Sequence, residues 1–162
     1  MDKLWAPWRS KYITQVKSIK GCIFCSKPRA KTDKLNYIIS RRRHSFSMLN
    51  IYPYNNGHIM IAPYRHVKDF SKLNDEEILD LFVLLKKSQE VISKALKPDG
   101  FNIGINVGRA AGAGYREHLH IHIVPRWVGD VNFMPVFAST KVISESLDDL
   151  YSKLKRCLNA KR

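Results

Sequence analysis

The hydrophobic and polar positions of this chain change period several times, and each period predicts a different element. Between Asn74 and Leu96 apolar residues recur every three or four positions, the spacing that places them on one face of a helix. Asn74 can cap this helix and Glu77 completes a capping-box pattern, whereas Pro98 and Gly100 end it. A second amphipathic helix is predicted near the C-terminus from Ile143, Leu147, Leu150, Leu154 and Leu158.

Shorter segments carry the signals of strands. Residues 37–39 and 45–51 alternate between apolar and polar positions, and 101–107 alternates strictly, which predicts one packed face and one polar face. The run at 59–62 is apolar on both faces, as expected for a central strand. The segment 118–124 alternates as well. Because strands and helices mix without regular alternation, we expect an α+β fold, a mainly antiparallel sheet with helices packed on one face.

Histidine occupies every second position in His118-Leu119-His120-Ile121-His122-Ile123-Val124. In an extended chain the three imidazoles project from one face. An exposed strand that merely happens to carry histidine is disfavoured, because such strands use Thr, Lys or Glu. The imidazoles could instead bind a catalytic zinc ion, or one could attack phosphorus while its neighbours bind phosphate oxygens. The outer two Cβ atoms lie roughly 13–14 Å apart in a straight strand, which is too far for one shared metal and favours attack on phosphorus.

Composition narrows the class of protein. A chain of 162 residues with 44% hydrophobic residues is expected to form one folded domain. Its formal net charge of +14 favours anionic partners. No apolar run is long enough to span a membrane and the first residues lack the apolar centre of a signal peptide, so we expect a cytoplasmic protein without a membrane partner.

Three cysteines are too few for the disulfide framework of a small secreted protein. Cys22 and Cys25 form a Cys-x-x-Cys pair, which supplies half of a tetrahedral zinc site or else two reduced, packed thiols. Cys157 is expected to pack against the core.

Two further features admit other functions. The glycine-rich loop at 108–114 could offer backbone N–H groups to an anion or be a plain hairpin connection, but it lacks the Gly-Lys-Ser/Thr of a phosphate-binding P-loop. A basic patch near Tyr37 could bind nucleic acid, although no recognition motif accompanies it and such runs are usually solvated, so nucleic-acid binding ranks below catalysis. The patch comprises Arg29, Lys31, Lys34, Arg41, Arg42 and Arg43.

The histidine segment resembles the signature of the histidine triad (HIT) family of nucleotide hydrolases and transferases. The resemblance covers roughly residues 20–126 and extends through Asn50, Gly57-His58-Ile59-Met60-Ile61, Pro63-Tyr64-Arg65-His66 and Asn106-Val107-Gly108. Leu4–Arg9 and Pro125–Phe133 are similar to the bacterial branch that includes diadenosine tetraphosphate phosphorylases. The resemblance implies one HIT-like domain over 1–162, with a basic, Trp-containing arm (1–34), a catalytic core (35–126) and a C-terminal extension with a helix (127–162).

The resemblance also implies roles for individual residues. His120 is the expected nucleophile, which takes a nucleotidyl group from the α-phosphorus, and His122 the expected donor to a phosphate oxygen. The substrate-binding positions are Asn50 and Ile51 for ribose and base, His58 and Asn106 for phosphate, and Gly112 and Gly114 in the loop. Many relatives carry Gln where this chain has Gly114, which leaves open how the departing group is assisted.

In relatives with this cysteine pair, zinc is completed by the last histidine of the Pro-Tyr-Arg-His segment and by the first triad histidine. Carried over, the ligands of a structural zinc ion are Cys22, Cys25, His66 and His118, with His44 as a rival fourth ligand. A homodimer or higher homo-oligomer is also expected.

The expected function is cleavage of dinucleoside polyphosphates through a nucleotidyl-histidine, with phosphate or water as acceptor. The alternatives are a hydrolase of other nucleotide conjugates, such as nucleoside phosphoramidates, and a non-enzymatic nucleotide-binding or RNA-binding protein.

Overall fold

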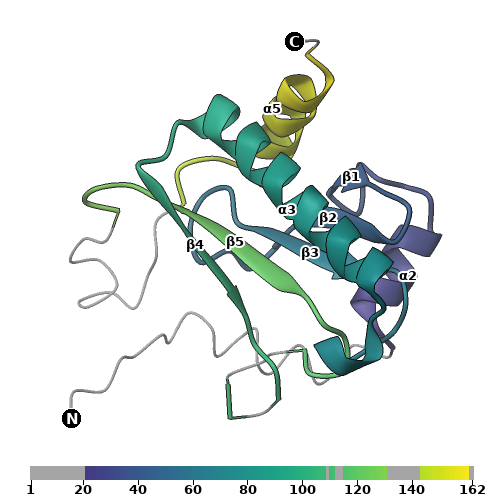
Figure 1. Ribbon diagram of the computed structural model, residues 1–162. Coiled ribbons are helices and arrows are strands. Elements are labelled where there is room, and N and C mark those ends of the chain that lie inside the picture. Colours follow the sequence, from purple (N-terminus) through teal and green to yellow (C-terminus); the bar gives the residue numbers. More distant parts are fainter. Residues whose placement is uncertain (1–20, 109, 112–114, 131–142, 161–162) are drawn as a thin grey trace, which may run out of the picture.

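The structure is a computed structural model that describes residues 21–108, 110–111, 115–130 and 143–160. The tryptophans of the N-terminal arm, Gly112 and Gly114 lie outside these ranges. The described chain forms an antiparallel sheet in the order β1-β2-β3-β5-β4, with helices on either side (Figure 1). The strands are β1 (Ile38–Arg41), β2 (Ser45–Leu49), β3 (Ile59–Pro63), β4 (Gly100–Ile105) and β5 (Ile121–Arg126). The helices are α2 (Ile23–Arg29), the short 3-10 helix η2 (Phe70–Lys72), α3 (Asp75–Leu96) and α5 (Leu147–Asn159).

The expected α+β fold is confirmed, with α3 and α5 packed on one face of the sheet (Figure 1). Aliphatic side chains from four strands meet the two helices there, among them Ile39, Leu49, Ile59, Ile61, Ile121, Ile123, Leu84, Ile92 and Leu154. The short helix α2 packs on the opposite face, where Phe24 joins Ile38, Phe46, Met48, Met60 and Ala62. The sheet therefore lies between two hydrophobic cores.

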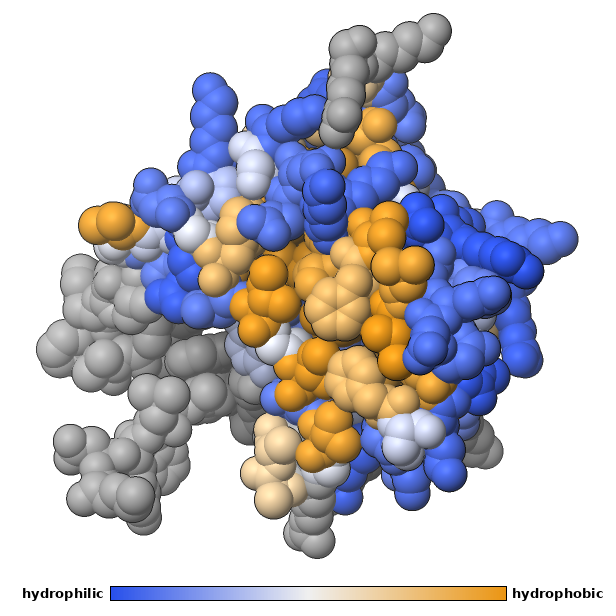
Figure 2. Space-filling view, in the orientation of Figure 1, coloured by the Kyte–Doolittle hydropathy of each residue, from blue (hydrophilic) through white to orange (hydrophobic). Residues whose placement is uncertain are grey.

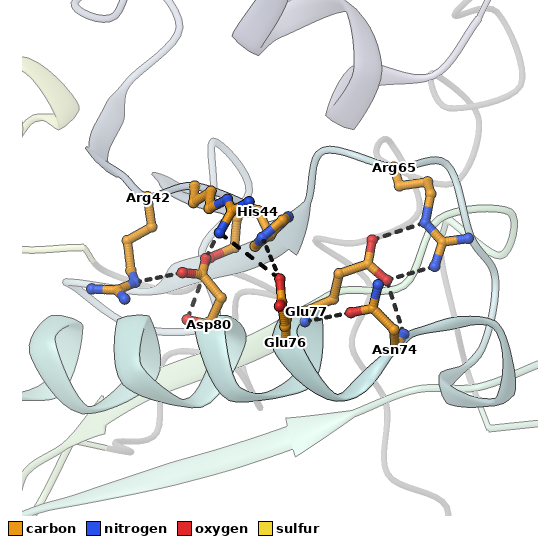
Figure 3. A network of polar contacts seen from close by, with 9 residues as sticks. Arg42, His44, Arg65, Asn74, Glu76, Glu77 and Asp80 are labelled. Carbon is orange, nitrogen blue, oxygen red and sulfur yellow. Dashed lines mark hydrogen bonds and ion pairs between the residues drawn. The ribbon is translucent and has the colours of Figure 1, made fainter.

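The sequence signals at α3 are present as predicted. The side chain of Asn74 accepts a hydrogen bond from the backbone N–H of Glu77 (2.9 Å), and the Glu77 carboxylate accepts one from the Asn74 N–H (3.0 Å). Asp80, one turn further on and only 6% exposed, accepts from Ser45 Oγ (2.5 Å) and Arg42 Nε (2.9 Å). These contacts bind the start of the helix to the β1–β2 hairpin (Figure 3).

Several element boundaries differ from the sequence prediction. The second strand ends at Leu49, and the last helix begins at Leu147, after a Ser146 cap, so Ile143 precedes it. The strand that carries the histidines begins only at Ile121, because the residues before it do not pair with the neighbouring strands. There Pro63 has no N–H to donate, and the N–H of Leu119 donates to Val67 O (2.6 Å) instead.

The apolar face of β4 is only partly covered, whereas the sequence predicted a packed one. Ile103 is 46% exposed because β4 is the edge strand and lies beyond the helices that cover the inner strands. Leu79, Phe82 and Val83 of α3 are exposed as well. Figure 2 shows apolar side chains gathered across this side of the molecule. No helix in the described ranges is both long and apolar enough to cross a lipid bilayer.

Candidate active site and metal centre

The three triad imidazoles lie next to one another along the segment that enters β5, as predicted. The Phe24 ring contacts both His118 (centroids 5.2 Å apart) and His120 (4.7 Å), and His120 lies 4.7 Å from His122. His118 and His120 precede the first paired residue of the strand. The side chains of His118 and His120 still lie on the same side of this segment, since both contact the Phe24 ring.

His120 is held in a single tautomer. Its Nδ1 lies 2.8 Å from the backbone oxygen of His118, and because a carbonyl oxygen only accepts, Nδ1 must carry the proton. The lone pair is therefore on Nε2. The side chain is 5% exposed, and this burial lowers the pKa of His120 although the carbonyl contact opposes the shift. The result is a neutral imidazole with one nitrogen available for attack.

A second chain of hydrogen bonds sets the tautomer of His122. The backbone N–H of Tyr54 donates to His58 Nδ1 (3.1 Å), so the proton of the buried His58 ring is on Nε2. That nitrogen lies 2.9 Å from His122 Nδ1 and donates to it. His122 Nε2 consequently carries a proton and is a donor, as a phosphate oxygen requires.

Other predicted substrate residues lie near this pair. The Asn50 amide lies 3.4 Å from His58 Nδ1, and its oxygen accepts from the N–H of Tyr52 (2.9 Å). Ile51 follows Asn50 and is 41% exposed. Asn106 lies one residue beyond β4, where the register that pairs Ile105 with Ile121 would bring it beside His120.

The four predicted metal ligands come together, although they belong to distant parts of the chain. Their ligand atoms all lie within 4.8 Å of one another. Cys22 Sγ is 3.2 Å from His118 Nδ1, and Cys25 Sγ is 3.4 Å from His66 Nδ1. Two sulfur and two nitrogen donors suit a tetrahedral metal ion.

A backbone carbonyl of β3 orients the His118 ring so that one of its nitrogens could bind a metal ion. Its Nε2 donates to Pro63 O (2.9 Å), which leaves the lone pair on Nδ1, the atom that faces the thiols. Burial lowers the pKa of His118 to about 4, so the ring is neutral, the form that binds a metal.

The structure disfavours the alternative interpretations of the histidines and of the basic patch. Of the three triad imidazoles only His118 belongs to the four-ligand cluster in the described chain, which disfavours a metal shared by all three. His44 does not join the cluster, and its Nε2 lies 3.6 Å from Glu76 of α3 (Figure 3). In the basic patch Arg41 and Arg42 are already paired, with Asp33 (2.7 Å) and Asp80 (2.9 Å), which weakens the case for nucleic-acid binding.

Sequence reasoning missed three contributors to the site. Two are backbone atoms, Pro63 O and the N–H of Tyr54, which no residue pattern marks. The third is Phe24, which stacks on His120 from inside the cysteine pair. The sequence does carry a signal for it, since Phe24 is an aromatic residue between the two cysteines of the Cys-x-x-Cys pair in an otherwise basic segment.

Fold and site together define an α+β protein with a buried, neutral imidazole beside a separate cysteine–histidine cluster. The HIT domain model matches residues 31–128, and the chain belongs to the HIT domain family. AP-4-A phosphorylase of Mycobacterium tuberculosis is 35% identical over 156 residues, which cover 92% of this chain and 80% of that protein.

Two further similarities extend the comparison. The asymmetrical bis(5'-nucleosyl)-tetraphosphatase of Schizosaccharomyces pombe is 36% identical over 93 residues, which are 57% of this chain and 50% of that protein. A crystal structure of a hypothetical histidine triad nucleotide-binding protein from Sulfolobus tokodaii superposes with a TM-score of 0.66 at 28% identity, covering 85% of this chain and 89% of that one. The two relatives named by activity are enzymes that act on nucleotides.

Proposed function

We propose that this nucleotide-processing enzyme transfers a nucleotidyl group from dinucleoside polyphosphates, with diadenosine tetraphosphate as the representative substrate. The observation that carries the proposal is the hydrogen bond between His120 Nδ1 and the His118 carbonyl, which leaves a buried, neutral Nε2 with a free lone pair. The two relatives named by activity support the substrate class.

In the first half-reaction, His120 Nε2 attacks the α-phosphorus of the substrate. A phosphorus–nitrogen bond forms while the bond from that phosphorus to the bridging oxygen breaks, and ATP departs with the electron pair. The Nδ1 proton stays on the ring, where the His118 carbonyl stabilises the positive charge that the imidazole gains. His122 Nε2 donates to a phosphate oxygen and stabilises the charge that develops there.

In the second half-reaction, an oxygen of orthophosphate attacks the same phosphorus. The phosphorus–nitrogen bond breaks, its electron pair returns to Nε2, and ADP leaves. Water in place of orthophosphate would give AMP. The similarity to the phosphorylase spans 92% of this chain and that to the tetraphosphatase 57%, which favours orthophosphate.

The test is incubation with diadenosine tetraphosphate with and without orthophosphate. Phosphate-dependent release of ADP and ATP is expected, and AMP with ATP in the absence of phosphate would identify a hydrolase instead. Alkaline quenching and mass spectrometry should detect a nucleotide on His120. The His120→Asn variant should lose the adduct and several orders of magnitude in rate, whereas His44→Asn, outside the site, should keep both. Release of neither product set would contradict the substrate assignment.

We also propose that Cys22, Cys25, His66 and His118 hold a zinc ion. The set of two thiolates and two imidazoles is typical of structural zinc, and four protein ligands leave no open position for substrate. When bound, the ion ties α2 to the loop after β3 and to the triad. Purified protein should contain one zinc per chain, and Cys25→Ser should lower that content.

We further propose that two copies associate through the apolar surface formed by Leu79, Phe82 and Val83 of α3 with Ile103 of β4. This surface adjoins the outer edge of β4, which has no partner strand on that side among the described residues. A two-fold axis would bring two such edges together in antiparallel fashion and cover both apolar surfaces.

A further inference from the structure

Phe24 makes an unusual contact for a residue of a metal-binding segment. It lies between the two cysteines, is 1% exposed, and stacks on His120 with ring centroids 4.7 Å apart and an interplanar angle of 28°. It also contacts the ring of His118, with centroids 5.2 Å apart. One aromatic ring therefore lies against both a metal ligand and the nucleophile.

The hydrogen bond of His120 and its ring contact with His122 leave one motion of the His120 ring uncontrolled. The hydrogen bond from Nδ1 to the His118 carbonyl fixes the tautomer, but a single hydrogen bond allows the ring to tilt about it. His122 meets the ring at 71°, which places an edge rather than a flat surface against it. Only the near-parallel Phe24 ring, among the ring contacts of the described chain, covers a face of the imidazole.

The element that carries Phe24 is itself anchored. Cys22 and Cys25 on either side of it lie beside His118 and His66, and Arg41 Nη2 donates to Pro28 O at 3.0 Å. Tyr115 meets Phe24 edge-on at 5.8 Å and donates its hydroxyl to Gly21 O (2.7 Å). The ring is therefore held from several sides and can act as a fixed surface.

We propose that Phe24 is a positioning residue for the nucleophile, whose ring braces one face of the His120 imidazole and keeps Nε2 aimed at the α-phosphorus. This inference rests on the proposed function. Attack needs the nitrogen lone pair aligned with phosphorus, and a tilted ring reduces the fraction of productive encounters. Losing the brace therefore lowers the rate of nucleotidyl transfer without weakening substrate binding.

The chain offers a matched control for ordinary loss of packing. Phe46 belongs to the same apolar cluster, is 0% exposed, and stacks on Tyr64 with centroids 5.3 Å apart at 24°. Replacing either phenylalanine by leucine removes a buried, stacked ring from one core. Only Phe24→Leu removes it from a triad histidine.

The experiment measures single-turnover formation of nucleotidyl-His120 at several diadenosine tetraphosphate concentrations, together with zinc content and melting temperature. We expect Phe24→Leu to lower the maximal rate at least tenfold while the half-saturating concentration changes less than twofold. Phe46→Leu should keep the maximal rate within twofold despite a similar loss of melting temperature. Phe24→Met, which fills the space without a flat ring, is measured alongside in case the leucine variant fails to fold.

Equal maximal rates in the Phe24 and Phe46 variants would overturn the positioning role, as would a loss expressed only in the half-saturating concentration. The failure of the proposed function looks different, because the unaltered protein would then form no adduct on His120. If the unaltered protein forms the adduct and both Phe24 variants form it at the same rate as the unaltered protein, the positioning role is refuted while the proposed function stands.

Discussion

At the scale of single residues, backbone atoms decide which nitrogen of each histidine is available. The His118 carbonyl accepts a hydrogen bond from His120 Nδ1, Pro63 O accepts one from His118 Nε2, and the Tyr54 N–H donates one to His58 Nδ1. The three imidazoles have the same chemistry in solution, but in this fold each has its proton fixed on a particular nitrogen by a different backbone group. In the proposed mechanism His120 attacks phosphorus, His118 would hold the metal ion, and His58 sets the tautomer of His122.

His58 offers a direct test of this assignment. His58→Asn removes the donor to His122 Nδ1, so His122 no longer keeps its proton on Nε2. We expect kcat to fall about 10-fold to 100-fold, approaching the loss typical of a missing oxyanion donor, with a smaller change in KM. Tyr54→Leu is the control, since it removes the ring stacked on His58 but keeps the backbone donor. Equal losses in the two variants would contradict the assignment.

Gly57 gives a prediction about stability. Its φ is +79°, and a Cβ there would lie 2.5 Å from Leu96 Cδ1 and 3.0 Å from Pro125 Cγ. Gly57→Ala should lower the free energy of unfolding by about 2 kcal/mol or more, because backbone strain and overpacking add. Gly100→Ala is the control, since no atom lies within 4 Å of its added Cβ. Urea denaturation measures both, and equal losses would argue against the steric explanation.

At the scale of elements, α3 separates what a sequence pattern can reveal from what it cannot. The capping box follows from local spacing, so Asn74 and Glu77 were predictable. The bonds from Asp80 to Ser45 and Arg42 join residues more than 30 positions apart, which no local period encodes. The start of β5 was misplaced for a related reason, because it depends on Pro63 in another strand.

The Glu77–Arg65 pair predicts a pH dependence of stability. Contact with Arg65 lowers the pKa of Glu77 from 4.5 to about 2. Because the folded-state pKa is the lower one, the stabilisation is complete above pH 4.5 and is lost as the pH falls towards 2. Glu77→Gln should cost about 1–2 kcal/mol at pH 7, less than a fully buried hydrogen bond to a charged group because the Arg65 side chain is half-exposed.

The measurement is the free energy of unfolding of both proteins across this pH range. The difference between them should shrink as the pH falls from 4.5 and vanish near 2. Glu76→Gln serves as the control, since that side chain is 71% exposed and its loss should change little at any pH. A difference that stays constant down to pH 2 would show that the ion pair is not its source.

At the scale of the whole molecule, the sequence predicted the alternation of the triad histidines because this motif is short and local. The local sequence pattern did not predict which residues would form the cysteine–histidine cluster. Its members lie about 40 and 90 positions apart in the chain, and only the family resemblance indicated them. The exposed apolar edge could not be foreseen. Strict alternation in 101–107 predicts a face to be covered but does not say whether this chain or a second copy covers it.

The proposed association of two copies gives the last prediction. Phe82→Asp places a charge in the middle of the apolar surface and should convert a dimer into a monomer at micromolar concentration, as measured by light scattering after size-exclusion chromatography. Lys86→Asp, which changes the charge of α3 one turn further along, is the control. A monomeric unaltered protein would contradict the proposal.

The atoms that fix the histidine tautomers have one further consequence. Every residue carries a backbone carbonyl, so no substitution deletes the His118 oxygen, and only proline, which also restrains the backbone, deletes the N–H of residue 54. An alanine scan would therefore assign the chemistry to the rings and pass over the groups that direct them. Only replacement of a peptide bond by an ester at these positions would reveal their share.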